Sequence, residues 1–294
     1  MWSPERILVG TDFSPSGNAA VEVASALSRR TGAAIEIVHV IDPRPRPRSG
    51  YEIVDDLLSR GRDTAEARRK ARLRLEDLAV EAGVSKARVS ALSGEPAATI
   101  LSKRAKEEPD LTVLGARGLR GLRRFVLGSL ADRALRQPGC PLLLVNESPP
   151  AGEFKKILAA VELPDEPTLW LRNALAIGHQ LRSEVVILHV LPPQGYVSDA
   201  RHVELDPESA PARLEKLARD FDPTIPIEIS LRRGDPAAVI PSFANRLGAD
   251  LVVMGAERRD DGWPGRVADR VARAALPALL YVWPEPDVPG EPDA

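Results

Sequence analysis

The chain has few of the residues that indicate a disulfide framework, a metal cluster or a membrane segment. It holds one cysteine, Cys140, among 294 residues, so an intrachain disulfide and a cysteine-based metal cluster are both excluded. Aromatic residues make up only 4% of the sequence, which argues against a surface that stacks the bases of single-stranded nucleic acid. No apolar run approaches the length that spans a bilayer, and the first residues lack the apolar core of a signal peptide. We therefore expect a cytoplasmic protein with no membrane partner.

An excess of charge of one sign is also absent. The formal net charge is −2, so no global field favours binding to nucleic acid, and we expect no nucleic-acid partner. The hydrophobic content of 44% and the mean hydropathy of −0.16 are typical of a soluble protein with packed cores. The length suits two domains of ordinary size.

The common catalytic and phosphate-binding motifs are missing too. There is no Gly-Lys pair, and therefore no Walker A loop, and the glycines do not follow the GxGxxG dinucleotide pattern. We find no GxSxG elbow, no HExxH helix and no kinase-like motif. Cys140 precedes a proline at an expected strand entrance, so we interpret it as a packed structural thiol. These absences favour a binding protein over an enzyme.

Strand and helix patterns alternate through the first 145 residues. The expected strands are residues 6–11, 33–40, 87–91, 110–114 and 141–145. The expected helices are residues 19–30, 59–81, 96–106 and 129–136. Such alternation predicts an α/β fold, in which right-handed crossovers build a parallel sheet with helices on both faces.

The pattern then returns, which indicates a tandem duplication. Residues 7–40 match residues 157–190 at a constant offset of 150, and both segments end in His-Val. Residues 94–98 and 110–116 recur at an offset of 140. We therefore expect one domain over residues 1–147 and a second over residues 154–284. The Pro-rich, acidic residues 285–294 are expected to form a disordered tail.

One stretch, residues 111–131, has the composition of an anion-binding loop. Gly115, Gly118 and Gly128 punctuate it, and four arginines lie between residues 116 and 131 with no acid before Ala131. Glycines let a backbone approach a ligand closely, and Ser129 opens a helical pattern whose first N–H groups suit a phosphate. The alternative is a mobile Gly/Arg surface loop.

The spacing of this stretch resembles the nucleotide loop of ATP-binding universal stress proteins. The match runs from Gly115 over two residues to Gly118, and over nine more to Gly128 and Ser129. Three further matches are Gly10-Thr11-Asp12 after the first strand, His39-Val40 at the end of the second, and the closing strand 141–145. The resemblance implies two tandem Rossmann-like domains, each with a five-stranded, doubly wound parallel sheet of order 3-2-1-4-5.

The resemblance also implies a ligand and a set of contacts. The ligand would be ATP or another adenine nucleotide, with Mg²⁺ bridging its phosphates. Asp12 would bind the adenine or order the site, Thr11 would pack near the base, and the Val40 backbone would read the adenine edge. The ribose would be lined by Leu114 and Gly115. The phosphates would be held by Arg117 and by the backbones of Gly118, Gly128, Ser129 and Leu130.

Two of the candidate residues have simpler interpretations. Asp12 could serve only as the N-cap of the first helix. His39 recurs as His189, and we interpret both as packed, hydrogen-bonded strand residues rather than catalysts.

The second repeat has lost the loop that the first repeat carries. Gly118 is replaced by Arg258 and Ser129 by Arg266, and the spacer to Gly265 holds six residues rather than nine. Three acids cancel three arginines there, whereas the loop of the first repeat carries four arginines and no acid. We therefore expect one nucleotide per chain, in the first repeat.

The sequence thus predicts a nucleotide-binding, non-enzymatic stress-response protein. The alternatives are a slow metal-dependent ATPase or phosphotransferase, and an interaction scaffold that binds no nucleotide. Each repeat ends in an apolar strand, residues 142–145 and 279–283, and exposed apolar edges favour pairing. In the family that the chain resembles, these strands pair across a dimer axis, so we expect the two repeats to supply both halves as an intrachain pseudo-dimer. Self-association of whole chains into a homodimer stays open.

Overall fold

A computed structural model gives the fold of the chain. It describes residues 3–43, 65–117, 127–137, 139–146, 153–161, 169–191, 226–255, 266–274 and 276–282, together with residues 212, 214–216 and 219. The expected tail 285–294, residues 147–152 at the join of the two repeats and the first residues of the expected helix 59–81 lie outside this part of the chain.

Strands and helices alternate in the first repeat, as expected, and in the second repeat outside the largely undescribed residues 192–225. The first repeat holds β1 (Arg6–Gly10), α1 (Pro15–Thr31), β2 (Ala34–Ile41), α3 (Ala65–Glu81), β3 (Arg88–Ser93), α4 (Pro96–Glu107), β4 (Leu111–Gly115), α5 (Ser129–Arg136) and β5 (Leu142–Val145). The second holds β6 (Lys156–Val161), α6 (Leu169–Leu181), β7 (Glu184–Leu191), β8 (Ile227–Arg233), α8 (Pro236–Leu247), β9 (Leu251–Gly255), α9 (Arg266–Ala272) and β10 (Ala278–Val282).

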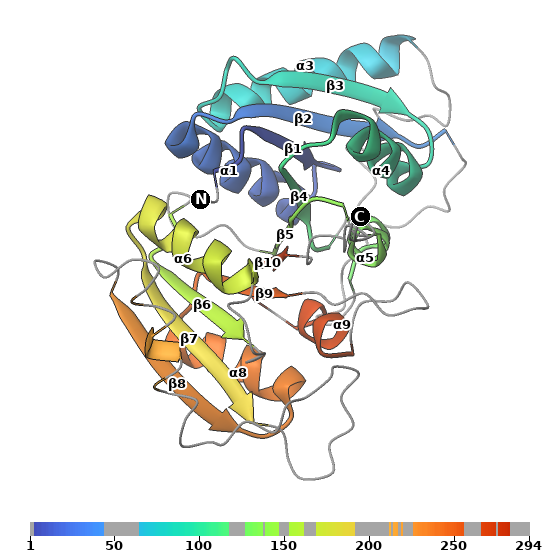
Figure 1. The fold of residues 1–294 in the computed structure, drawn as a ribbon. Helices are drawn as coiled ribbons and strands as arrows, with labels where there is room; N and C mark the ends of the chain where they lie inside the picture. The colour runs from blue at the N-terminus through green and yellow to red at the C-terminus, as the bar shows by residue number, and fades with distance from the viewer. Residues whose placement is uncertain are drawn as a thin grey trace, which may run out of the picture.

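The strands of both repeats form one ten-stranded sheet in the described residues (Figure 1). Its order is β3-β2-β1-β4-β5-β10-β9-β6-β7-β8. Each half therefore has the order 3-2-1-4-5 with parallel neighbours, which confirms the predicted fold class. At the centre β5 pairs with β10 in antiparallel register, with Leu143 opposite Leu280. The two apolar closing strands therefore cover one another's edges.

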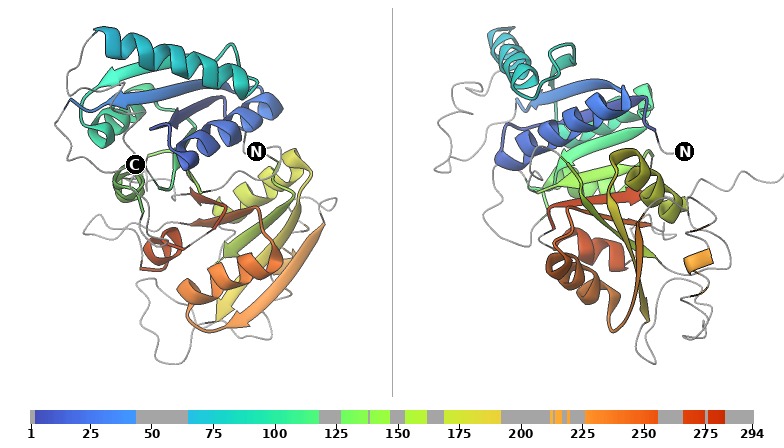
Figure 2. Two further views of the ribbon diagram at one scale, coloured as in Figure 1. Left: turned by 180° about the vertical axis from the view of Figure 1, so that it is seen from behind. Right: turned by 90° about the vertical axis from the view of Figure 1, so that its left-hand side faces the viewer.

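The helices lie in two layers, one on each face of the sheet (Figures 1 and 2). Helices α1, α3 and α6 pack on one face through a core that includes Val9, Leu75 and Ile187. Helices α4, α5, α8 and α9 pack on the other face through a core that includes Leu114 and Tyr281. Because both cores run across the two repeats, the repeats share a single three-layer body.

The first helix begins four residues earlier than the sequence pattern predicted. We expected residues 19–30, but α1 starts at Pro15, because the Ser14 side chain caps it and accepts from the N–H of Gly17. Its end is as expected, since Gly32 takes the left-handed conformation, with φ of 78°. The ends of several strands also differ by one or two residues from the expected ranges.

One polar contact recurs in both repeats and supports the duplication. The Asp110 carboxylate accepts from the N–H groups of Glu5 and Arg6, at 2.9 and 2.8 Å. In the second repeat Asp250 accepts from Lys155 and Lys156, at 2.8 and 2.9 Å. The same device thus anchors the start of the first strand in each half.

None of the helices in the described ranges is both long and apolar enough to cross a membrane.

Candidate functional site

The sheet changes its winding direction between β1 and β4. The chain leaving β1 enters α1 on one face, whereas α5, which follows β4, lies on the opposite face. Ligands of doubly wound sheets bind in the crevice beyond the carboxyl ends of such strands. The predicted residues Thr11, Asp12 and Gly115 lie at this place.

The turn after β1 is held by hydrogen bonds to its own side chains. The Phe13 N–H donates to Thr11 Oγ1 at 3.0 Å, and the Ser14 N–H donates to Asp12 Oδ1 at 3.0 Å. Thr11 is buried, and its own N–H donates to the Val38 carbonyl at 2.9 Å. The interpretation of Asp12 as the N-cap of the first helix is wrong, because Ser14 has that role.

Phe13 is a part of this turn that the sequence did not reveal. Its φ is 60°, an uncommon conformation for a residue with a bulky side chain. The ring lies 4.5 Å from the His39 ring, between centroids, and Arg74 Cζ of α3 lies 4.2 Å from the Phe13 centroid. His39 is buried, and its Nδ1 lies 2.9 Å from the Thr11 carbonyl oxygen. Arg74, Phe13 and His39 therefore form a stack that supports the turn.

His189 makes the equivalent contact in the second repeat, since its Nδ1 lies 2.9 Å from the Val161 carbonyl oxygen. The prediction that both histidines are packed, hydrogen-bonded strand residues is confirmed.

The backbone of Val40 faces the crevice. The Val38 carbonyl accepts from Thr11 on the β1 side of β2, whereas the Ile41 carbonyl accepts from Gly94 on the β3 side. Peptide groups alternate in direction along a strand, so Val40 N–H and C=O point to the same side as those of Val38. The β1–β2 ladder ends at the pair Gly10 and Val38. Val40 therefore presents a donor and an acceptor beyond the last residue of β1.

Gly115, at the end of β4, allows α1 to approach closely. A Cβ at this position would lie 2.8 Å from the Gly17 nitrogen and 2.8 Å from the Ser16 carbonyl carbon. The Ser16 hydroxyl donates to the Arg117 carbonyl. These contacts fix the point at which the Gly/Arg loop leaves the sheet, above the first turn of α1.

The same loop returns to the sheet at Gly128. The Gly128 N–H donates to the Ala116 carbonyl at 2.8 Å, so the two ends of the loop are joined by a hydrogen bond. The residues between them, 118–126, which include the predicted Gly118 and three of the four arginines, lie outside the described residues. The corresponding segment of the second repeat, residues 256–265, also lies outside them.

The first turn of α5 differs from the other helix starts for which a cap is described. α1, α4 and α8 are capped by side chains of Ser14, Glu95 and Asp235. The N-cap of α5 is Gly128, and no side chain in the described part of the chain caps this helix. Internal bonding begins with the N–H of Asp132, which donates to Gly128. The N–H groups of Ser129, Leu130 and Ala131 are thus left for a ligand or water. Ser129 is itself exposed.

Two of the predicted site residues, Leu114 and Leu130, form the apolar base of the crevice. A Cβ on Gly10 would lie 2.8 Å from Leu114 Cδ2 and 3.9 Å from Leu130 Cδ2. The end of β1, the end of β4 and the start of α5 therefore meet here. Of the ten predicted site residues, the structure describes nine. Eight of them lie in these elements and the turns next to them, and the ninth, Val40, lies in β2.

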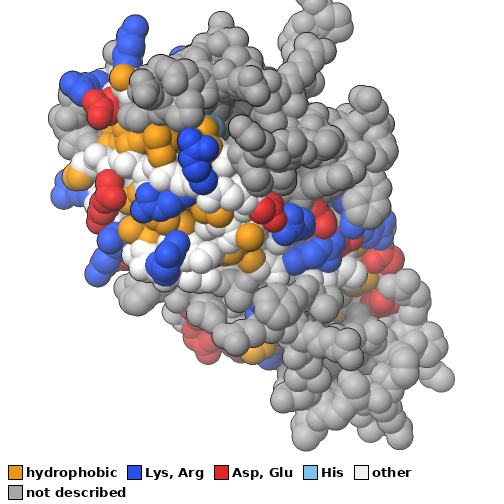
Figure 3. Space-filling view, turned by 90° about the horizontal axis from the view of Figure 1, so that it is seen from below, with side chains coloured by type: hydrophobic (Ala, Val, Ile, Leu, Met, Phe, Trp, Pro, Cys, Tyr) orange, Lys and Arg blue, Asp and Glu red, His pale blue; other side chains and the backbone are white. Residues whose placement is uncertain are grey.

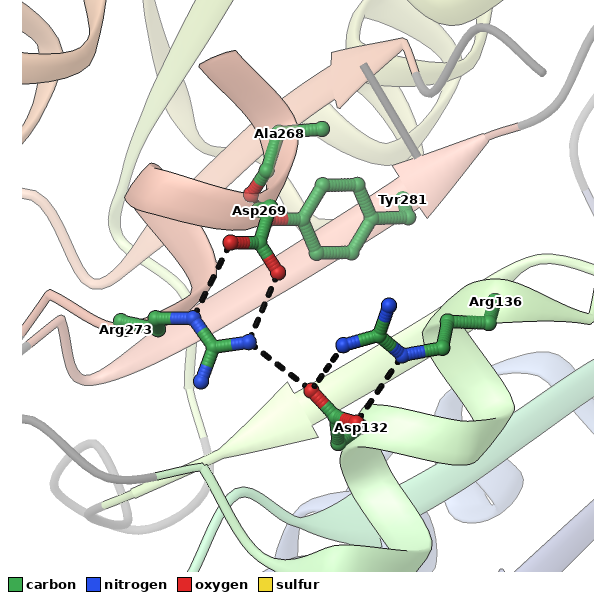
Figure 4. A network of polar contacts seen from close by, with 6 residues as sticks. All are labelled: Asp132, Arg136, Ala268, Asp269, Arg273 and Tyr281. Atoms are coloured by element: carbon green, nitrogen blue, oxygen red, sulfur yellow. Dashed lines mark hydrogen bonds and ion pairs between the residues drawn. The ribbon is translucent and has the colours of Figure 1, made fainter. Parts of the chain in front are cut away.

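An ionic network begins in the first turn of α5 and reaches the second repeat (Figure 4). Asp132 Oδ2 lies 2.9 Å from Arg136 Nε, and Asp132 Oδ1 lies 2.9 Å from Arg273 Nη2. The same Arg273 nitrogen lies 2.8 Å from Asp269 Oδ1. Burial alone would raise the pKa of Asp132, but the two arginines outweigh it, so the pKa lies below its usual value. The only acid in the first turn of α5 is thereby neutralised.

Cys140 is partly buried, with its Sγ 3.0 Å from Thr112 Oγ1. Burial raises the pKa of its thiol, which disfavours the reactive thiolate. No group of three or more metal-ligating side chains occurs among the residues that the structure describes.

Comparison with known proteins identifies relatives for both halves. A family model described as the universal stress protein family matches residues 4–146 and 153–283. A universal stress protein of Methanocaldococcus jannaschii is 31% identical over 147 residues, which cover 49% of this chain and 82% of that relative. One from Thermus aquaticus is 33% identical over 142 residues, covering 48% of this chain and 98% of the relative.

Among solved structures, a universal stress protein from Archaeoglobus fulgidus DSM 4304 superposes with a TM-score of 0.69 and 17% identity. The match covers 96% of this chain and 98% of that protein. At such an identity the likeness shows the fold alone.

Proposed function

Because the chain belongs to the universal stress protein family, we propose that its first repeat binds ATP as a regulatory, non-catalytic module of the stress response. The observation that carries this proposal is the uncapped first turn of α5 at the switch point of the sheet. Helix N-termini bind phosphates through such N–H groups and through the positive end of the helix dipole.

The adenine end of the ligand fits the other side of the crevice. Val40 N–H and C=O face the space beyond β1, and one donor beside one acceptor complements an adenine edge. Asp12 begins the turn beneath this space, and Thr11 is buried there. Leu114 and Gly115 lie between this end and α5, where the ribose would pass.

The phosphates would lie at the first turn of α5. The backbones of Gly128, Ser129 and Leu130 form this turn, and the loop that begins at Arg117 and continues through Gly118 joins it to β4. Asp132 would repel phosphate if it were alone, but its charge is balanced by Arg136 and Arg273. Mg²⁺ would arrive on the phosphates, as it often does with few protein ligands.

We propose one such site per chain, with residues 1–147 as the nucleotide-binding domain and residues 154–284 as its partner. The three acids in the second-repeat loop oppose phosphate binding there. The β5–β10 pairing supports the view that the two repeats form an intrachain pseudo-dimer. ATP occupancy would then alter conformation or partner choice without turnover, since the sequence holds none of the common catalytic motifs.

Calorimetric titration of ATP with Mg²⁺ into the whole chain tests the proposal. We expect one site per chain and its loss in Gly118→Glu, which places bulk and negative charge in the phosphate region. The matched control is Arg258→Glu, at the corresponding position of the second repeat, which should bind as the wild type does. Two equivalent sites, or an unchanged affinity in Gly118→Glu, would contradict the proposal. Phosphate release above background with Mg²⁺ would favour an ATPase instead.

A further inference from the structure

The far end of the sheet in the second repeat carries a groove that nucleotide binding does not involve. Strand β8 is the last strand of the described sheet, and α8 packs beside it. A groove of about 290 Å³ lies between them, lined by Arg232, Phe243, Arg246 and Leu247. Figure 3 views the molecule from this end and shows hydrophobic side chains among those of Lys and Arg.

The equivalent place in the first repeat is filled by an ion network. Glu36 of β2 lies 2.9 Å from Lys103 Nζ of α4, and the same nitrogen lies 2.7 Å from Glu107. The Ser90 hydroxyl of β3 donates to Glu36 at 2.5 Å. The side chains of Glu36 and Lys103 are only 10% and 11% exposed. The carboxylates of Glu36 and Glu107 therefore balance the positive charge of Lys103.

The second repeat has exchanged these charged residues for apolar ones. At the offsets of 150 and 140 found in the sequence, Glu36, Lys103 and Glu107 correspond to Val186, Phe243 and Leu247. Leu92 corresponds to Arg232 and Lys106 to Arg246. Both carboxylates are thus gone, and position 232 has gained a guanidinium, whereas Arg88, which pairs with Glu36 in the first repeat, corresponds to Glu228. A repacked core would explain the apolar residues, but it does not explain a guanidinium added at position 232.

Within the described part of the chain, neither arginine of the rim pairs with a carboxylate. Arg232 Cζ lies 4.9 Å from the Phe243 ring centroid, and Arg232 Nη1 donates to the Leu231 carbonyl at 2.7 Å. Arg246 makes no ion pair with a residue in the described part of the chain. Both arginines are exposed, and Phe243 and Leu247 form an apolar floor between them. Two guanidiniums at an apolar groove suit an anion attached to an apolar group.

We propose that this groove docks an extended segment of a partner protein in which a carboxylate side chain neighbours an apolar one. The carboxylate pairs with Arg232 and Arg246, and the apolar side chain lies on Phe243 and Leu247. An extended segment is favoured because β8, the last strand of the sheet among the described residues, offers backbone N–H and C=O groups to an added strand. Four described side chains line the groove, too few to enclose most of a small molecule.

Fluorescence anisotropy with a labelled octapeptide in which Glu alternates with Val tests this proposal. We expect the full chain to bind it, and binding to weaken at least tenfold in Arg232→Gln and in Arg246→Gln. The matched control is Lys106→Gln, at the position of Arg246 in the first repeat, which should not change binding. Leu247→Glu should also abolish binding, because it restores the carboxylate of the first repeat. Circular dichroism checks that each variant is folded.

Four outcomes would overturn the assignment. The first is no binding by the wild type, and the second is equal binding of a peptide in which Lys replaces Glu. The third is tighter binding after deletion of residues 284–294, which would make this chain's own acidic segment the occupant. The fourth is a dimer that Glu228→Gln dissociates, since antiparallel pairing of two β8 edges would place Glu228 of one copy opposite Arg232 of the other. None of these depends on whether the first repeat binds ATP.

Discussion

Arg273, the residue after the end of α9, and Asp132 of α5 form an ion pair between the two repeats, with 2.9 Å from Nη2 to Oδ1. The same Arg273 nitrogen also lies 2.8 Å from Oδ1 of Asp269 in α9. Asp132 and Asp269 are equivalent positions of the duplication, so this guanidinium lies between two related helices. The helix proposed to bind phosphate is therefore anchored from the other repeat.

Removal of the Arg273 guanidinium should weaken the interface between the two repeats. We expect Arg273→Gln to lower the free energy of unfolding by about 1–2 kcal/mol, because two partly buried carboxylates lose a charged donor. Urea denaturation measures the change. Arg270→Gln is the control, because its pair with Asp235 lies within the second repeat and is more exposed. If Arg270→Gln lowers the free energy of unfolding by as much, the location of Arg273 between the repeats does not make its ion pairs more stabilising.

The ion pairs of Asp132 also make the free energy of unfolding depend on pH in the acid range. The folded pKa of Asp132 lies below its usual value, and the unfolded value is about 3.9. Ionised Asp132 thus stabilises the fold fully above the unfolded pKa, and this contribution is lost as pH falls through the folded pKa. Between pH 5 and 3 we expect Asp132→Asn to lose less stability than the wild type. The control is Asp77→Asn, on the exposed face of α3, whose free energy of unfolding should change with pH as that of the wild type does. If the free energy of unfolding of Asp132→Asn falls in parallel with that of the wild type, Asp132 is not the source of the pH dependence.

The arrangement of the elements could be predicted because it depends on local patterns. Buried parallel strands are apolar runs, and Gly32 and the Gly94 turn mark the ends of elements within the sequence itself. The ends of the elements are thus encoded within a few residues. The order of the strands followed from the family resemblance, and the pairing of β5 with β10 followed from the same resemblance together with their apolar edges.

Two of the features that the sequence did not reveal require distant residues to meet, whereas the third is local. Asp132 has a local partner four residues away in Arg136, so nothing in the pattern indicated Arg273. The left-handed turn at Phe13 is held by Arg74 and His39, which come from other elements. The start of α1 was missed because Ser14 and Pro15 read as a turn, although a capping serine and a first-turn proline also open helices.

The close approach at Gly115 should tolerate no added atom. A methyl group there meets backbone atoms of Ser16 and Gly17 at 2.8 Å, and backbone cannot move without shifting α1. We expect Gly115→Ala to cost about 2 kcal/mol of stability, as measured by thermal unfolding. Gly10→Ala is the comparison, because its contacts at 2.8 and 2.9 Å are with the ends of the Leu114 and Ile100 side chains, which can rotate. A larger loss for Gly10→Ala would contradict this ranking.

The stability contributed by the buried pair of Glu36 and Lys103 can be tested with the residue that the second repeat has in place of Glu36. Lys103→Met leaves the carboxylate of Glu36 with less compensation in a nearly buried place, and we expect it to cost about 3 kcal/mol. Adding Glu36→Val should recover most of this loss, because the second repeat has Val186 at the equivalent position. Lys106→Met, on the exposed side of α4, is the control. If the double variant is no more stable than Lys103→Met, the carboxylate is not the source of the cost.

The stack of Arg74, Phe13 and His39 should influence nucleotide affinity without touching the phosphates. Arg74 lies over the Phe13 ring at 4.2 Å, and Phe13 is held in a left-handed conformation directly after Asp12. Arg74→Met keeps the length of the side chain but removes the charge, and a cation–π contact contributes about 1 kcal/mol. We therefore expect ATP to bind about fivefold more weakly, through loss of order at Asp12. The control is Arg72→Met, on the same helix, whose guanidinium pairs with Glu76 at 3.0 Å. Titration of ATP into both variants, with thermal unfolding as a check on the fold, separates the effects. If the two variants bind ATP equally, the stack does not position the adenine end of the site, whereas failure of the wild type to bind would concern the proposed function itself.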